Sequence, residues 1–277
     1  MLNKLSFQNQ VNAVGGLAFL VAGSFFAYEL TRSRDAKPCD ARYPSATQMS
    51  LQKSGGEILS PGELQARAGN GERGVLEKAS VVKVTGAPSP LALTVQVGGT
   101  GDTGASFFWA PGGLQKATAA CLSYHVFLPK DLDFALGGQL PGLFGIARGA
   151  NQRGFATRFT WDEQGGMGIE ANLSDYDLTA PLTDSVFYRS QALLPRGRWV
   201  QVDQEVTLNT PNAQNGILRL WVDGRLKLED TTVAWRGNGS LSISGSLTEV
   251  GYRAERLEGP TKKSANIIVS PPHLSWN

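Results

Sequence analysis

The chain has 277 residues with 26 basic and 24 acidic side chains, which gives a formal net charge of +2. Charged residues make up only 18% of the sequence and 33 residues are Gly, a composition typical of a turn-rich globular protein. A charge of +2 spread over the chain provides no clustered basic face, so we expect no nucleic-acid partner. Two cysteines and two histidines argue against a Cys/His zinc site, and no phosphate- or dinucleotide-binding motif is present. We therefore expect neither a metal nor a cofactor.

The first 30 residues contain an apolar segment. No charged side chain occurs between Leu5 and Tyr28. Residues 11–28 would span about 27 Å as a helix, which is enough for a thin bilayer. Lys4 in front of this segment and small residues at 22–24 are equally typical of a secretory signal peptide. We predict one hydrophobic helix in residues 1–30, either a signal anchor or a signal peptide, with membrane contact through residues 11–28.

The charges around this segment leave its orientation open. Arg32, Arg34 and Lys37 follow it, whereas only Lys4 and the terminal amine precede it. The positive-inside rule would then place the rest of the chain in the cytoplasm. We instead favour a body outside the cytoplasm, either membrane-anchored or secreted, because of the family resemblance described below.

The two cysteines, Cys39 and Cys121, are either two separate thiols or one disulfide. A bridge would close a loop of about 80 residues and contribute about 4 kcal/mol to stability. Alternatively, Cys121 is a small apolar side chain on a buried strand.

From residue 76 onward the sequence is typical of an all-β protein. Residues 31–75 are polar and rich in Gly and Ser, and we expect a linker and an irregular segment there. After them, short runs rich in Val, Ile, Leu, Phe and Trp alternate with turn residues at the regular spacing of a sandwich. The run Val222-Asp223-Gly224-Arg225 is a tight hairpin between two apolar runs. Residues 76–277 are expected to form one β-jelly roll or concanavalin-like sandwich.

Alternation within two neighbouring strands separates core side chains from a polar face. In residues 155–161, Trp161 shares one face with the phenylalanines, which leaves Arg158 on the other face. In residues 168–173, Ile169 is expected in the core, with Glu170 and Asn172 facing the opposite way. We therefore expect Arg158, Glu170 and Asn172 on one exposed sheet face that forms a cleft for an extended polymer.

Several stretches, in this order, resemble polysaccharide lyase family 14. They are YHVFLPKDLDFALGGQLPGLFG at 124–145, FATRFTWDEQGGMGIEANL at 155–173, GRWVQVDQEVTLNT at 197–210, GILRLWVDGRL at 216–226 and a closing strand at 266–270. The resemblance covers about residues 75–277 and implies a β-jelly roll that cleaves acidic polysaccharides, such as alginate or glucuronan, by β-elimination. That reaction needs a group that neutralises the sugar carboxylate, a base for the adjacent ring proton and an acid for the leaving oxygen.

The residues that the resemblance places at the family's site depart from its pattern. The loop lysine of the family is replaced by Gln139, its serine by Ala156, and its two tyrosines by Glu170 and Asn172, whereas its arginine is retained as Arg158. Gln139 cannot carry a proton at neutral pH, so the family mechanism cannot operate unchanged. The guanidinium of Arg158 still fits a carboxylate. We therefore expect an acidic polysaccharide as ligand, with Gln139, Arg158 and Asn172 as binding residues.

Four residues are candidates for the chemistry itself: Arg158, Glu170, His125 and Tyr124. His125 is of interest because an imidazole titrates near neutrality, and a carboxyl group such as that of Glu170 acts as acid or base in a suitable environment. Each has a structural alternative, such as an ion pair between Arg158 and Glu170 or a satisfied histidine on a strand. Tyr124 and His125 point to opposite faces of their strand.

Three functions remain open at this stage. The first is a lyase-like enzyme with a rearranged catalytic set, and the second is a catalytically inactive carbohydrate-binding module. The third is a membrane-tethered structural or interaction subunit that has a protein partner. The fold alone does not choose among them, because function depends on the site.

Overall fold

The computed structural model describes residues 39–68, 72–98, 104–114, 116–134, 137–147, 153–177, 185–237, 240–253 and 264–277, without the side chains of 174–177. The hydrophobic helix predicted within residues 1–30, and its membrane contact through residues 11–28, lie outside this part of the chain. Among the described residues, no helix has both the length and the apolar character needed to cross a membrane.

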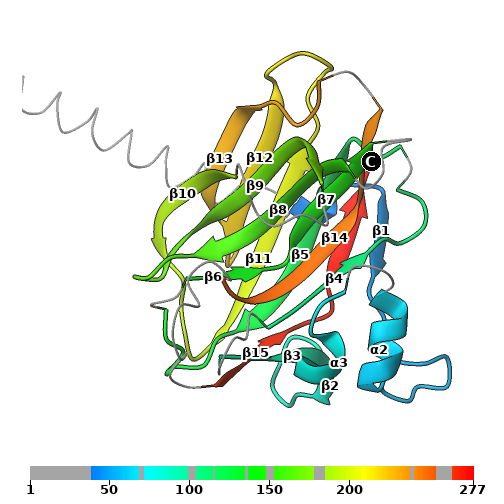
Figure 1. Cartoon of the computed structure of the whole chain (residues 1–277), viewed down its shortest axis with the longest axis vertical. Helices are drawn as coiled ribbons and strands as arrows, with labels where there is room; N and C mark the ends of the chain where they lie inside the picture. Colours follow the sequence, from blue (N-terminus) through cyan, green and yellow to red (C-terminus); the bar gives the residue numbers. More distant parts are fainter. Residues whose placement is uncertain are drawn as a thin grey trace, which may run out of the picture. The chain divides into compact units, whose positions relative to one another are not determined.

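The described strands form two antiparallel sheets (Figure 1). The nine-stranded sheet contains β1 (Ser45–Gln48), β2 (Ala79–Lys83), β3 (Leu91–Val97), β5 (Ala119–Phe127), β11 (Trp199–Thr207), β12 (Gly216–Val222), β13 (Arg225–Val233), β15 (Ala265–Val269) and β16 (His273–Trp276). Its order is β13-β12-β11-β5-β15-β3-β2, and β16 pairs with both β5 and β1.

The seven-stranded sheet contains β4 (Ala105–Trp109), β6 (Gly138–Leu140), β7 (Gly142–Ala147), β8 (Arg153–Trp161), β9 (Gly166–Asp177), β10 (Val186–Leu193) and β14 (Leu241–Tyr252). Its order is β10-β9-β8-β6-β14-β4, and β7 pairs with β14 and β8. Strands β10 and β13 are therefore edge strands of the two sheets. Because antiparallel strands alternate their side chains, each sheet has one face available for a core and one face available for other contacts.

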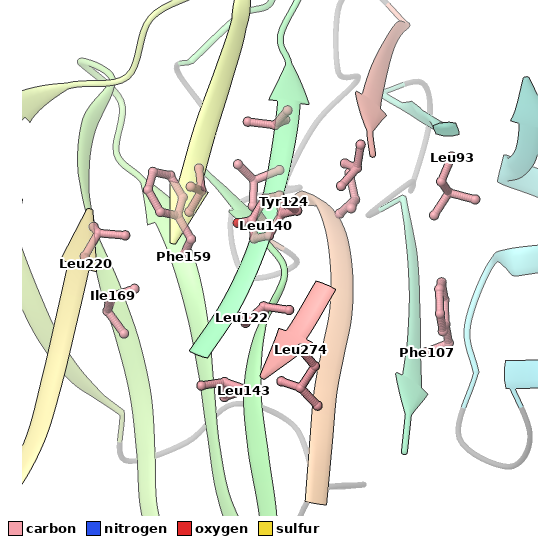
Figure 2. Packing of buried hydrophobic residues seen from close by; sticks show 14 of the residues in the cluster. Leu93, Phe107, Leu122, Tyr124, Leu140, Leu143, Phe159, Ile169, Leu220 and Leu274 are labelled. Atoms are coloured by element: carbon pink, nitrogen blue, oxygen red, sulfur yellow. The ribbon is translucent and has the colours of Figure 1, made fainter. Parts of the chain in front are cut away.

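The apolar faces of the two sheets pack against each other. Phe159 and Ile169 of the seven-stranded sheet and Leu122 and Leu220 of the nine-stranded sheet belong to one cluster and are fully buried (Figure 2). Burial of such a side chain contributes about 1.5–3 kcal/mol, so the interior between the sheets is the main source of stability. The architecture is a β-sandwich consistent with the jelly roll expected for residues 76–277.

A linker and an irregular segment were expected over residues 31–75, of which the structure describes 39–68 and 72–75. This described part contains η1 (Cys39–Arg42), β1, α2 (Pro61–Ala68) and the start of α3 (Val75–Lys78). Leu51 and Leu64 belong to the main core. Ser60 and Glu63 bond reciprocally at the start of α2, as in a capping box. Elements this short show little periodicity, so their few buried side chains did not stand out in a polar stretch.

A disulfide joins Cys39 to Cys121, with Cα atoms 5.7 Å apart. Of the two alternatives left by the sequence, the structure contains the bridge. It holds η1 against the outer face of the nine-stranded sheet, where the Glu205 carboxylate accepts hydrogen bonds from Arg42 and Tyr43. The segment that follows the predicted membrane helix is thus fixed covalently to the sandwich.

Candidate functional site

Polar side chains from four neighbouring strands of the seven-stranded sheet, β9, β8, β6 and β14, meet on its outer face, away from the core. The register pairs Arg158 with Glu170 and Gln139 with Thr160, and it pairs Gln139 also with Gly251. Directly opposed residues point to the same face of a sheet, and so do residues two apart in one strand. Asn172, two residues after Glu170, and Glu249 and Arg253, on either side of Gly251, therefore lie on this outer face as well. The resulting set, here called the outer-face cluster, consists of Gln139, Arg158, Glu170, Asn172, Glu249 and Arg253.

Arg158 is held by two partners within this cluster. Its Nε donates to the Glu249 carboxylate at 2.5 Å, and its Nη1 donates to Oδ1 of Asn172 at 2.9 Å. Glu249 also accepts from Arg73 at 2.7 Å. The side chain of Arg158 is 5% exposed. The ion pair considered from the sequence therefore exists, but its carboxylate is that of Glu249 and not that of Glu170.

Glu170 is the second buried charge of the outer-face cluster. It is 1% exposed, and its carboxylate accepts from Nε2 of Gln139 and from Nη2 of Arg253, each at 3.2 Å. The structure thus brings Gln139, Arg158, Glu170 and Asn172 to one sheet face, as alternation predicted. It differs from the prediction in their exposure, because all four are buried in contacts with one another or with neighbouring strands.

The other two candidates from the sequence lie elsewhere. Tyr124 is in the core between the sheets, where its hydroxyl donates to the Pro141 carbonyl at 3.1 Å. Burial, with a smaller contribution from Asp203, raises the pKa of Tyr124 well above its usual value. His125 projects from the outer face of the nine-stranded sheet, and burial lowers its pKa. Neither side chain is part of the outer-face cluster.

A cleft of about 250 Å³ opens beside this cluster. We call it the first cleft; among its lining residues are Thr160, Gly168, Phe187, Arg189 and Arg253. The register places Phe187 opposite Glu170 and Arg189 opposite Gly168, so both side chains emerge on the outer face. The guanidinium of Arg253 lies over the Phe187 ring at 4.7 Å. The first cleft therefore combines two guanidinium groups with an aromatic ring.

Sequence reasoning did not select the residues of the first cleft as binding residues. The alternation in β10 was a usable signal, because it puts Phe187 and Arg189 on one face. The position of Arg253 after β14 carries no such signal, since only the pairing of β14 with β6 brings it to Glu170.

The described lining of the first cleft holds no residue suited to take a proton from a sugar ring. Asp162 is engaged in a turn, where it accepts hydrogen bonds from the backbone of Gln164 and Gly166. Burial and the nearby Asp230 raise the pKa of Tyr188, which disfavours the phenolate. In the described part of the chain, no group of three or more His, Cys, Asp or Glu side chains is placed to hold a metal ion. The cleft offers hydrogen-bond donors and positive charge, which suit a carboxylate.

A family model described as polysaccharide lyase 14 matches residues 91–252. The alginate lyase of Aplysia kurodai superimposes with a TM-score of 0.61 at 18% identity, over 74% of this chain and 89% of that one. For the alginate lyase vAL-1 of Chlorella virus the TM-score is 0.61 at 18% identity, over 83% and 100%.

The endo-β-1,4-glucuronan lyase of Trichoderma reesei gives a TM-score of 0.55 at 14% identity, over 76% of this chain and 90% of that one. No curated protein sequence matches the chain. At such identities the structural likenesses demonstrate the fold alone. The family model, in contrast, matches more than half of the sequence. The chain belongs to polysaccharide lyase family 14.

Proposed function

We propose that this protein binds an acidic polysaccharide along the outer face of the seven-stranded sheet, with a uronate unit in the first cleft. The observation that carries the proposal is the convergence of Arg189, Arg253 and the Phe187 ring in that cleft. Guanidinium groups bind carboxylates with two parallel hydrogen bonds, and an aromatic ring offers an apolar surface to the sugar. The solved relatives are lyases of alginate and of glucuronan, both acidic polymers, which supports this class of ligand.

Arg189 is the more available of the two guanidinium groups. It is exposed, and it forms no ion pair with any other described residue. Arg253 is shared with Glu170, so it contributes a positioned donor rather than a free charge. Arg158, the arginine retained from the family pattern, is enclosed by Glu249 and Asn172. In this proposal, Arg158 supports the sheet face and the two arginines of the first cleft contact the polymer.

Binding without cleavage agrees best with the geometry. The positions where the resemblance implies a lysine and two tyrosines hold Gln139, Glu170 and Asn172. Gln139 and Asn172 carry amides, which do not transfer protons at neutral pH, and the carboxylate of Glu170 is held by Gln139 and Arg253. Cleavage by β-elimination is the second candidate function, favoured by family membership and by the presence of a carboxyl group, Glu170, at one tyrosine position.

We further propose that the sandwich lies outside the cytoplasm, tethered by residues 11–28 or released after cleavage of that segment. The Cys39–Cys121 disulfide supports this location, because structural disulfides persist in oxidising compartments. Protease treatment of intact cells that express the full chain tests it. Digestion of the body from outside is expected, and full protection until the membrane is opened would contradict the proposal.

The binding proposal is tested by titrating the protein with alginate and glucuronan, with a neutral glucan as the comparison polymer. Binding to both acidic polymers, or to one of them, is expected, without an increase in the ultraviolet absorbance of unsaturated sugar ends. Arg189→Ala should weaken binding about tenfold, the effect of one charge-assisted contact. Lys83→Ala on β2 makes the same charge change far along the other sheet and should leave affinity unchanged.

Two results would decide against this proposal. Equal affinity of the wild type and Arg189→Ala would remove the first cleft from the binding site. A steady increase in absorbance would establish the lyase function in place of binding alone.

A further inference from the structure

A second cleft, of about 400 Å³, opens between β10 and β13, the edge strands that lie near each other in Figure 1. Its lining combines apolar and charged residues. The apolar ones are Met167, Ala192, Leu193, Pro195 and Val222, and the charged ones are Arg198, Asp223, Arg225 and Lys227. The site is therefore suited to a ligand that has both an apolar surface and a negative charge.

The charged part of this lining carries excess positive charge. Nη2 of Arg198 donates to Asp223 at 2.6 Å, and the other oxygen of Asp223 accepts from the backbone N–H of Gln201 at 3.0 Å. Arg225 and Lys227 have no carboxylate partner among the described residues. Three cations against one carboxylate leave two positive charges that solvent, or an anionic ligand, must balance.

The local backbone explains why the cations converge. Asp223 has a φ of 50° and Gly224 a φ of 69°, so the chain reverses within two residues and Arg225 pairs with Val222. The register between β12 and β13 then shifts by one residue and leaves Lys227 without a directly opposed partner. A bulge of this kind re-aims a side chain. Both cations are thus placed at the cleft by the hairpin and not by ion pairs.

The two clefts share one wall. Phe187, Arg189 and Ser190 of β10 line the first cleft, whereas Ala192 and Leu193 of the same strand line the second. Met167 of β9 lines both clefts as well. Two residues along a strand span about 7 Å, so the clefts are neighbours along β10. A polymer that occupies the first cleft needs only to cross this edge strand to enter the second.

We propose that the second cleft is an accessory subsite that binds a further uronate unit of the same acidic chain. The apolar lining, which includes the exposed Leu193, receives the C–H face of the sugar ring, and Arg225 and Lys227 bind its carboxylate. This inference rests on the proposed function, because it extends the binding path that begins at Arg189 and Arg253.

The test compares uronate oligomers of two lengths. Short oligomers fill only the first cleft, whereas long ones reach both. The double variant Arg225→Gln, Lys227→Gln should raise the Kd for long oligomers about tenfold and leave the Kd for short oligomers unchanged. The matched control Lys83→Gln, Arg153→Gln also removes two exposed positive charges and should change neither value. Thermal unfolding of each variant verifies that it is folded.

The outcomes separate this inference from the proposed function. If the wild type binds oligomers of both lengths and the Arg225/Lys227 variant keeps its full preference for long ones, the accessory subsite is wrong and the first cleft stands. An equal loss for short and long oligomers, or an equal loss in the control, would also overturn the subsite. If the wild type binds no acidic polymer, the proposed function fails and the subsite fails with it.

Discussion

Replacing Glu249 by Gln should destabilise the fold more than replacing Arg158 by Met, although the two side chains form one ion pair. The reason is the asymmetry of their remaining partners. Without the charge of Glu249, the buried guanidinium of Arg158 retains only neutral partners, the amide of Asn172 and the amide introduced at position 249. Without Arg158, the carboxylate of Glu249 is still paired with Arg73 at 2.7 Å.

The expected costs follow from this difference. An uncompensated buried charge costs about 3–5 kcal/mol, and Glu249→Gln should lie near the lower end, about 3 kcal/mol, because the amide oxygen still accepts from Arg158. Arg158→Met should cost about 2 kcal/mol, since two hydrogen bonds of about 1 kcal/mol each are lost while the carboxylate remains neutralised. The double variant should cost less than the sum of the two single changes.

Urea unfolding followed by tryptophan fluorescence measures these free energies. Asp162→Asn is a useful comparison, because among the described residues that carboxylate accepts hydrogen bonds only from the backbone of a turn. A cost for Glu249→Gln that is equal to or below that of Arg158→Met would refute the assignment of Arg73 as the compensating cation. Additive costs in the double variant would refute the pair itself.

Three further predictions concern stability. The double variant Cys39→Ser, Cys121→Ser should lose about 4.5 kcal/mol in urea unfolding, because the bridge spans a sequence separation of 82. Burial lowers the pKa of His125 in the folded protein, so as the pH falls the unfolded chain binds this proton before the folded protein does. The free energy of unfolding should therefore decrease below about pH 6.5, and it should decrease less in His125→Gln. Urea unfolding between about pH 7 and pH 5 measures this difference. In Gly138→Ala, a Cβ would lie 1.9 Å from the Trp161 ring, and overpacking should lower the unfolding free energy by about 1–3 kcal/mol, with a lower Tm.

Alternation predicted the shared face of Arg158, Glu170 and Asn172 because it depends only on each strand. Side chains in a strand repeat every two residues, so a single apolar face assigns the polar face as well. The same reasoning predicted the sandwich, since its strands have clear turn residues between them. Both results used information contained within about ten consecutive residues.

The partners of these side chains could not be predicted in the same way. Arg158 and Glu249 are separated by 91 residues, and their contact depends on the pairing of β14 with its neighbours. That pairing follows from the packing of the whole sheet, for which one sequence carries no direct signal. The burial of the outer-face cluster was missed for this reason, as was the place of Arg253 in the first cleft.

Hydrogen bonds within the outer-face cluster explain why Arg158 is enclosed. Asn172 accepts from Arg158, and on the same sheet face Gln139 donates to Glu170. A lysine at position 139 would instead bring a third cation beside Arg158 and Arg253. A tyrosine at position 172 would supply no amide oxygen for Arg158. Glu249 and Asn172 together fix the guanidinium in place. In our proposal, contact with the polymer then depends on the neighbouring cleft, where Arg189 remains exposed.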